Sequence, residues 1–163
     1  MVKLLRIDHD NWLDCIALQV ADDQQRFVNP NIFSLAEAFV HSDANPDCAE
    51  EYYRCLPYAI CADDELVGFA MLTYERECDY DNLPAYEIYR LMISHEHQGN
   101  GYGHSAVMEL LSIAASLPCG PAKAVYAQWH PENTASTQLF LSCGFDIIPY
   151  DGEEVTAKYS IAT

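Results

Sequence analysis

The chain has 163 residues, 50% of them hydrophobic, and 25 acidic side chains against 8 Lys and Arg give it a formal net charge of −17 at pH 7. This length and apolar content are sufficient for one domain with an ordinary core, which excludes a disordered chain. Such a negative charge repels phosphate backbones and anionic lipids, so we expect no nucleic acid and no membrane as partner. A cationic small molecule is the natural partner, although many proteins are acidic only for solubility.

Seven cysteines form an odd set with no C-x-x-C pair. This pattern is not typical of a disulfide framework or a zinc site, so we expect reduced thiols and no metal. Because no run reaches the roughly 18 apolar residues of a membrane-spanning helix, we expect a cytoplasmic protein. No repeat or linker-like segment divides the chain, which predicts a single domain over residues 1–163.

The first third of the chain predicts one strand followed by helices. "VKLLRI" (2–7) has the composition of a strand, and Asp10 is placed to cap a helix from about 11 to 20, where apolar residues recur at helical spacing. Between 31 and 55 we expect two short helices joined by the polar turn "HSDANP", each begun by a capping-box pair. These pairs are Ser34 with Glu37 and Asp47 with Glu50.

The rest of the chain predicts alternating strands and helices. "YAIC" (58–61) and "LVGFAMLTY" (66–74) predict a hairpin, in which Gly68 marks a bulge or a close approach. The order βααβββαβαββ, with helices between the strands of a mixed sheet, predicts an α/β fold around one central sheet. The further predicted elements are a strand at 86–93, a helix at 101–116, a strand at 124–129, a helix at 132–145 closed by Gly144, and strands at 145–150 and 155–160 joined by the turn "DGEE".

Three glycines alternate in "QGNGYG" between a predicted strand and a predicted helix: Gly99, Gly101 and Gly103. Without Cβ atoms the backbone can adopt positive φ there, and its amides can point at one anion beside the positive end of the helix. The spacing differs from the G-x-G-x-x-G of dinucleotide-binding folds, which also follows the first strand. The pattern therefore predicts an anion site, with a purely structural turn as the alternative.

These residues resemble a known family, the GNAT superfamily of acyl-CoA-dependent N-acyltransferases. Its Q/R-x-x-G-x-G/A motif is matched by "QGNGYG" (98–103), and its second element, an Asn followed by a helix and Gly-Phe, is matched by "NTASTQLFLSCGF" (133–145). The resemblance covers nearly the whole chain and implies a mostly antiparallel central sheet flanked by helices. The matching residues are Gln98, Gly101, Gly103, Asn133, Ser136, Leu139, Gly144 and Phe145.

The resemblance implies acetyl-CoA as the co-substrate. It places the pyrophosphate on the amides of the glycine loop, the pantetheine along the preceding strand, and the following helix against the cofactor. Pantetheine is a chain of amides, which an exposed strand edge can satisfy. The implied cofactor-binding residues are Leu91, Met92, Ile93, Gln98, Gly99, Asn100, Gly101, Tyr102, Gly103, His104, Asn133, Ser136 and Phe140.

The N-terminal half, with "QQRFVNPNIFSLAEA" and "PYAICADDELVGFAML", resembles bacterial spermine/spermidine N-acetyltransferases. This implies a polyamine acceptor, a flexible polycation that an acid-lined groove would attract. Alternatives are another amine, such as a protein N-terminus or an antibiotic, and a non-catalytic acyl-CoA-binding protein; a homodimer is left open. The candidate substrate-binding acids are Glu75, Glu77, Asp79 and Asp81, with Glu50 and Glu51 as further candidates.

Catalysis requires a base, because an ammonium group with a pKa of roughly 10 cannot attack a thioester. Related polyamine enzymes carry an acid nine positions before the residue that matches Gln98, but that position here is Tyr89. Strand alternation puts Glu87 on the face of Tyr89, so we predict Glu87 as the base and Tyr89 beside it. Phe140 occupies the position of the tyrosine that protonates the departing thiolate in many members, and it has no proton to give. Candidate replacement donors are Tyr89, Tyr102 and Tyr126.

Overall fold

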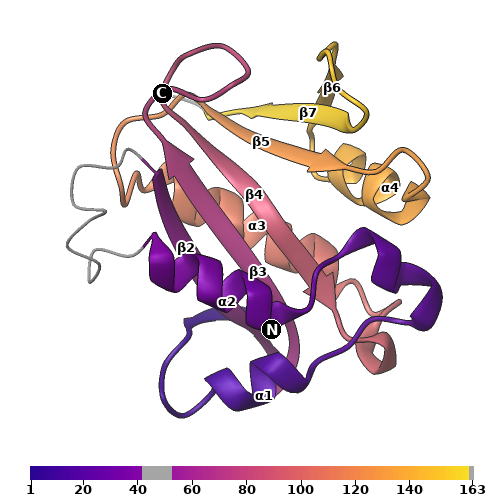
Figure 1. Ribbon diagram of the computed structural model, residues 1–163. Coiled ribbons are helices and arrows are strands. Elements are labelled where there is room, and N and C mark those ends of the chain that lie inside the picture. The colour runs from indigo at the N-terminus through magenta and orange to yellow at the C-terminus, as the bar shows by residue number, and fades with distance from the viewer. Residues whose placement is uncertain (42–52, 162–163) are drawn as a thin grey trace.

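A seven-stranded sheet runs through the molecule and carries helices on both faces (Figure 1). The computed structural model describes residues 1–41 and 53–161. The strands are β1 (Val2–Arg6), β2 (Tyr53–Ala62), β3 (Glu65–Glu75), β4 (Ala85–Ile93), β5 (Ala124–Trp129), β6 (Asp146–Ile148) and β7 (Val155–Ser160). The helices are α1 (Trp12–Ala17), α2 (Asn31–Val40), α3 (Tyr102–Ala115) and α4 (Thr134–Ser142), with 3₁₀ turns η1 (Asp22–Phe27) and η3 (His95–His97).

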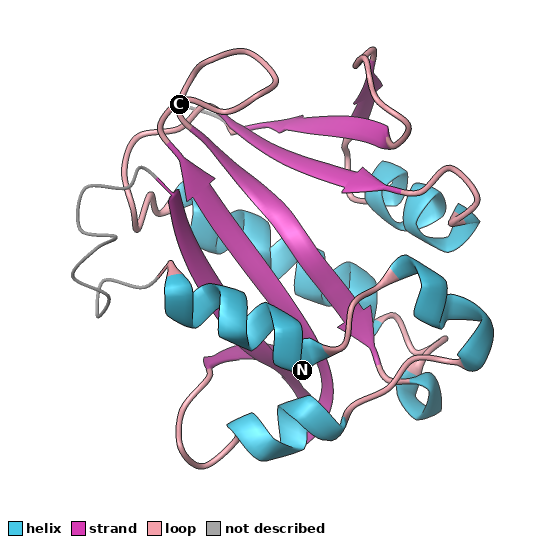
Figure 2. Cartoon of the chain, in the orientation of Figure 1, coloured by secondary structure: helices cyan, strands magenta, loops and turns pink. Residues whose placement is uncertain are grey.

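The strand order is β1-β2-β3-β4-β5-β7-β6, and each neighbouring pair is antiparallel except β4 with β5. Helices α1 and α2 cover one face of the sheet and α3 the other (Figure 2). Strand β3 contributes side chains to the cores on both faces of the sheet. Phe69 and Met71 pack under α1 and α2, while Ala70 and Leu72 pack into the larger α3 core. The predicted α/β class and element order are confirmed.

Two predicted helix caps are wrong. Asp10 does not cap α1: the side chain of Asn11 closes that turn instead, with Nδ2 donating to the Arg6 carbonyl at 2.9 Å and Oδ1 accepting from the Asp8 amide at 3.0 Å. The helix ends at Ala17 rather than near residue 20.

The capping-box prediction at Ser34 also fails, because Ser34 lies inside α2 and is 1% exposed. Pro30, with φ −52°, sits at the N-cap and starts the helix at Asn31. The predicted second helix, with Asp47 and Glu50, falls outside the described residues except at its end, where residues 53–55 belong to β2.

Strands β4 and β5 touch only at one end. Their parallel register covers Tyr86 opposite Val125 and Glu87 opposite Tyr126, and beyond Glu87 the two strands diverge (Figure 1). On its other side β4 stays paired with β3 as far as Ile93 opposite Gly68. The β4 edge after Glu87 therefore faces an opening in the sheet, which leaves backbone groups of this edge unpaired with β5.

Gly68 lies at a close approach, one of the two alternatives predicted for it, and beside a register shift. A Cβ atom there would overlap the Met92 carbonyl oxygen, which is the predicted close approach. The β2–β3 register also shifts between Ile60 and Cys61, next to Gly68. A glycine at this position thus lets β3 and β4 stay paired up to the edge of the opening.

A bulge in β4 sets the direction of its side chains. Met71 pairs with Arg90 and Leu72 with Ile88, so Tyr89 is an extra residue without its own partner on β3. Ile88 packs into the α3 core, whereas Tyr89 packs on the α1 and α2 side. Because Tyr86 and Ile88, on either side of Glu87, both pack into the α3 core, Glu87 lies on the opposite face together with Tyr89, as strand alternation predicts.

The six cysteines that the structure describes are free thiols. In the same part of the chain no helix is long and apolar enough to cross a bilayer. One described group, Asp8, His9 and Asp10, brings possible metal-ligand atoms close together, but all three residues are exposed and none lines the opening between β4 and β5.

Candidate active site

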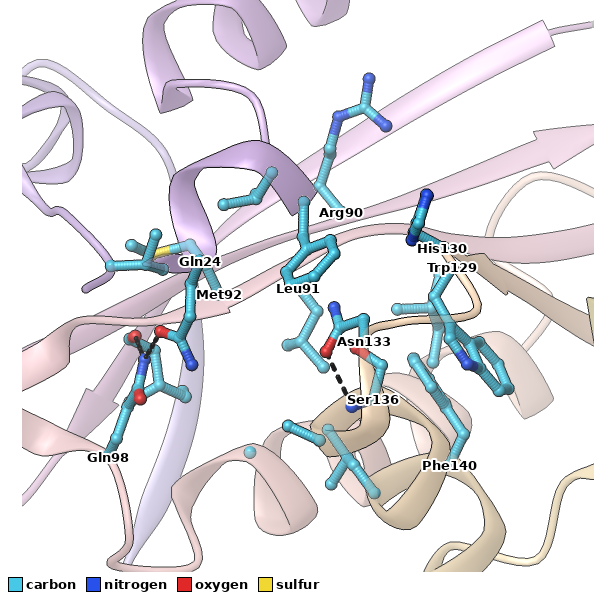
Figure 3. Close-up of a pocket in the computed structure, with 18 of the residues that line it drawn as sticks. Gln24, Arg90, Leu91, Met92, Gln98, Trp129, His130, Asn133, Ser136 and Phe140 are labelled. Atoms are coloured by element: carbon cyan, nitrogen blue, oxygen red, sulfur yellow. Dashed lines mark hydrogen bonds between the residues drawn. The ribbon is translucent and has the colours of Figure 1, made fainter. Parts of the chain in front are cut away.

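A cleft of about 630 Å³ occupies the opening between β4 and β5 (Figure 3). Its walls are the second half of β4, the glycine loop with the start of α3, the start of α4, and residues of η1. Most of the residues predicted to contact the cofactor line this cleft. These are Leu91, Met92, Ile93, Gln98, Gly99, Gly101, Tyr102, Gly103, His104, Asn133, Ser136 and Phe140.

The glycine loop has the geometry of an anion site. Gly99 and Gly101 have φ +78° and +77°, and a Cβ at either position would meet nothing within 4 Å, so the backbone lies open to the cleft. Gly101 is the N-cap of α3, a helix of 14 residues. The amides of the following first turn lack intrahelical acceptors and carry the positive end of the helix dipole. The loop can therefore hold a phosphate group at the mouth of the cleft.

Gln98 and Asn100 shape this loop. Gln98 Nε2 donates to the Ile93 carbonyl at 2.9 Å and to Gln24 Oε1 at 2.8 Å, which ties the loop to β4 and to η1 (Figure 3). Asn100 Nδ2 donates to the His97 carbonyl at 3.0 Å, and Asn100 does not line the cleft. The Asn100 side chain therefore shapes the loop, and only its backbone amide is left among the loop amides predicted to contact the cofactor.

Along β4 a ligand in the cleft can reach the backbone more readily than the side chains. Leu91 and Ile93 pack toward the α3 core, while Met92 is 6% exposed on the opposite face, where its Sδ accepts from Asn31 Nδ2 at 3.8 Å. These side chains are fixed by packing and leave the strand edge as the group that a ligand can reach. An amide-rich chain can pair with such an edge as an added strand would.

The opposite wall is the start of α4. Asn133 caps this helix, since its Oδ1 accepts from the Ser136 amide at 3.1 Å (Figure 3). The side-chain amide of Asn133 keeps its donor atom, Nδ2, for another partner. Phe140 is 4% exposed and stacks on Trp129 with ring centroids 5.0 Å apart and planes at 14°. The two rings therefore make this part of the cleft wall apolar, at the position where many family members carry a tyrosine.

Glu87 is the acid at the floor of the cleft, where the two strands begin to separate. The pKa of its carboxyl is raised to about 7: burial raises it most, the nearby acids Glu75 and Glu154 also raise it, and the Tyr80 hydroxyl and the Arg90 guanidinium lower it. A carboxyl with this pKa is partly ionised near neutral pH and can both accept and release a proton. This matches the chemistry required of a general base.

The predicted tyrosines divide into two groups. Tyr89 and Tyr102 line the cleft; burial raises the pKa of Tyr89, whose ring lies 3.8 Å from the Arg90 guanidinium carbon. Tyr126 does not line the cleft, and its hydroxyl donates to Asp81 at 2.7 Å. Tyr126 is thus unsuited to protonate a leaving group, because its proton is committed to a carboxylate elsewhere.

The acids predicted to bind substrate differ in their position relative to the cleft. Glu75 lies near Glu87, and burial followed by the charge of Asp79 raises the pKa of its carboxyl. Glu77 and Asp79 are exposed and do not line the cleft. Asp81 accepts hydrogen bonds from Tyr126, Lys158 and the Leu83 amide, so we remove it from the substrate-binding set. Glu50 and Glu51 lie outside the described residues.

Sequence reasoning missed several cleft residues. Glu154 lies in the predicted turn "DGEE", where nothing local distinguishes it from its acidic neighbours. Arg90 also lines the cleft and pairs with Glu37 of α2 at 3.7 Å. Its position follows from the β4 bulge, which no pattern in the sequence predicts.

The segment η1 was missed altogether. It crosses the cleft from Gln24, bonded to the glycine loop, to Arg26, whose Nη1 donates to Glu132 Oε2 at 2.6 Å before α4. The Phe27 ring contacts His130 at 5.6 Å in the same region. Residues 22–27 have no helical or strand periodicity, so only their contacts reveal that they form part of the site.

A split mixed sheet with a glycine loop and a helix N-terminus at one end of the opening is the arrangement expected of an acyl-CoA-dependent acyltransferase. The chain belongs to the acetyltransferase (GNAT) family, whose model matches residues 19–145. It is accordingly an N-acetyltransferase that uses acetyl-CoA.

The chain is also similar to individual proteins along nearly its full length. It is 25% identical over 161 residues to a spermine/spermidine N(1)-acetyltransferase of Bacillus subtilis, covering 96% of this chain and 97% of the relative. A spermidine N-acetyltransferase of Vibrio cholerae, solved with CoA and spermine, matches with TM-score 0.65 at 13% identity over 98% of this chain and 95% of that one. A Bacillus subtilis acetyltransferase solved with CoA matches with TM-score 0.65 at 17% identity over 99% and 98%. At these identities the solved structures support the fold.

Proposed function

We propose that this enzyme acetylates a primary amine of a polyamine such as spermidine or spermine. The observation that carries the proposal is Glu87, an acid with a pKa raised to about 7 at the floor of a cleft whose strand edge is open. The net charge of −17 and the full-length similarity to spermine/spermidine acetyltransferases support a polycationic acceptor.

For the cofactor we propose one path through the cleft. The pyrophosphate of acetyl-CoA binds the amides from Gly99 to His104, and the pantetheine pairs with the β4 edge from Leu91 to Ile93. Asn133 and Ser136 contact the cofactor from α4. Phe140 packs against its sulfur end. The open φ-positive glycines and the unpaired strand edge support this path.

In the proposed reaction Glu87 takes a proton from the bound ammonium, directly or through one water. The neutral nitrogen attacks the thioester carbonyl, and a β4 backbone amide near Met92 or Ile93 stabilises the oxyanion of the tetrahedral intermediate. The C–S bond then breaks and releases CoA thiolate, while the nitrogen gives its second proton to solvent water, since Glu87 already holds the first, and becomes an amide. Since CoA thiolate has a pKa near that of cysteine, about 8.5, it can leave without a proton donor near neutral pH.

The distal cationic groups of the polyamine would lie against the acids next to Glu87. Glu75 and Glu154 are the described acids that interact with its carboxyl, and Glu154 itself lines the cleft. Arg90 does not cancel them, because Glu37 and the Tyr89 ring already engage its guanidinium. This leaves an acidic end of the cleft opposite the phosphate-binding loop.

A steep salt dependence is expected if acidity attracts the acceptor. We expect kcat/KM for spermine to fall as ionic strength rises from about 0.01 to 0.15 M, because the Debye length shortens from about 30 to 8 Å. An alkylamine of similar reactivity serves as the control and should change little. Equal kcat/KM for spermine and the alkylamine, without salt dependence, would point to a generic amine acceptor.

Restoring a hydroxyl at the cofactor's sulfur end tests the leaving-group step. Phe140→Tyr should raise kcat by a few-fold at most if protonation of the thiolate limits turnover, and leave it unchanged otherwise. Steady-state kinetics with a calorimetric check of CoA binding measures this. A loss above about tenfold with CoA binding intact would mean that the site needs an apolar ring, since this corresponds to about 1.4 kcal/mol of barrier.

A mass-spectrometric screen of amines with acetyl-CoA separates the alternatives. Monoacetylated spermidine or spermine as the main product supports the proposal, and preference for a peptide N-terminus or an antibiotic amine contradicts it. CoA binding without any product would indicate a non-catalytic protein. The homodimer left open by the sequence is a separate prediction, to be measured by sedimentation.

A further inference from the structure

The loop between β3 and β4 carries an aromatic side chain that the proposed mechanism has not used. Tyr80 packs on a small core formed by Cys78, Ala85, Ala124 and Tyr126. Its ring stacks on Tyr126 with centroids 4.2 Å apart and planes at 30°, and it meets the edge of Tyr150 at 5.1 Å. Two rings, one from β5 and one from the β6–β7 connection, thus hold Tyr80 from two sides.

Asp81 fixes the same loop. Its carboxylate accepts from the Tyr126 hydroxyl at 2.7 Å, from the Leu83 amide at 3.1 Å and from Lys158 Nζ at 3.2 Å. The Cys78 thiol is within 3.2 Å of the same group, and the Asn82 amide donates to the Cys78 carbonyl at 2.9 Å. The residue next to Tyr80 is therefore anchored to β5, to β7 and to its own loop.

This anchoring places Tyr80 beside Glu87. Tyr126 is the register partner of Glu87 across the β4–β5 pair, so both side chains lie on one face of the sheet. A ring stacked on Tyr126 on that face is adjacent to the Glu87 carboxyl. The Tyr80 hydroxyl lies close enough to this carboxyl to lower its pKa against the effect of burial.

We propose that Tyr80 is a positioning residue for Glu87: the rings of Tyr126 and Tyr150 and the anchored Asp81 hold its hydroxyl where it orients the carboxylate that receives the amine proton. The inference rests on the proposed function, because it assumes that Glu87 is the base.

The other groups around Glu87 cannot replace this contact. Glu75 from β3 and Glu154 from the segment before β7 favour the protonated form of the carboxyl. Arg90 from β4 favours the charged form, but its guanidinium donates to the Tyr89 carbonyl and pairs with Glu37. Tyr80 is the uncharged donor in this set, and it comes from a loop that the sheet holds in place.

The test is Tyr80→Phe, which keeps the stacked ring and removes the hydroxyl. We expect the pKa of Glu87, followed by NMR of the labelled side-chain carboxyl, to rise by about one unit, since a hydrogen bond contributes about 1 kcal/mol. The acid limb of the kcat/KM profile should move up by the same amount, with KM for acetyl-CoA unchanged. Tyr150→Phe is the matched control, because it removes a hydroxyl from a ring that packs on Tyr80, and it should leave both quantities unchanged.

A second variant, Asp81→Asn, weakens the anchor of the loop without touching Glu87 and should shift the pKa in the same direction by a smaller amount. An unchanged Glu87 pKa in folded Tyr80→Phe and Asp81→Asn proteins overturns the inference. A shifted pKa with a pH–rate profile that responds to neither Tyr80→Phe nor Glu87→Gln overturns Glu87 as the base instead. The two failures are therefore distinguishable.

Discussion

Glu87→Gln is expected to lower kcat by about 10²- to 10⁴-fold, the range that general base catalysis contributes. Glutamine keeps the shape of the side chain and its place at the floor of the cleft but cannot accept the amine proton. The measurement is steady-state kinetics with spermine at saturating acetyl-CoA. CoA affinity should stay at the wild-type value, because the proposed cofactor path starts beyond Glu87 on β4.

The pH dependence of kcat/KM provides a second test of Glu87 as the base. With a pKa of about 7, Glu87 is protonated and inactive as a base below that pH, so kcat/KM should rise through pH 7 and this limb should vanish in Glu87→Gln. Glu77→Gln, at an exposed acid outside the cleft, is the matched control. If Glu87→Gln retains both the limb and the wild-type kcat, Glu87 is not the base.

The stability of the folded protein should change with pH in the direction opposite to that of kcat/KM. Because the pKa of Glu87 is raised on folding, the folded state binds more protons than the unfolded state between the ordinary glutamate range and pH 7, and stability falls as pH rises through that window. Glu87→Gln removes this dependence. Thermal unfolding should therefore show a variant at least as stable as the wild type at pH 8, which would also establish that lost activity is not lost folding.

Gly101→Glu is expected to weaken CoA binding by about 100-fold or more. A residue with a side chain at φ +77° is strained by about 1–3 kcal/mol, and the open space around this Cβ is where we propose the pyrophosphate to bind. The added carboxylate would both occupy that space and repel the phosphates. Calorimetric titration with CoA measures the loss.

Two controls separate the contributions. Gly101→Gln has the same shape without the charge and should bind CoA more tightly than Gly101→Glu, by the amount that repulsion contributes. Gly152→Glu adds a charge in the β6–β7 connection, outside the cleft, and should leave CoA affinity unchanged. Wild-type affinity in a folded Gly101→Glu protein would remove the glycine loop from the cofactor site.

Local patterns predicted the elements better than their ends. The 3.6-residue periodicity of α3 and the apolar runs of β3 and β4 are patterns within contiguous residues. The sequence alone therefore predicted these elements and their order. The caps of α1 and α2 were misassigned because several residues near each helix start can occupy the N-cap, and Asn11 and Pro30 are found there in place of Asp10 and Ser34.

The candidate site shows the same division. By itself the sequence determined the glycine loop, the helical segment of α4 and the position of Glu87 on β4, because each depends on a contiguous segment and its backbone conformation. Only the tertiary structure decided where the sheet opens, that Glu154 and η1 line the cleft, and that Tyr80 lies beside Glu87. Those features arise from strand pairing and side-chain packing between segments far apart in the chain. The hydrophobic pattern of one segment does not specify which distant segment it will contact.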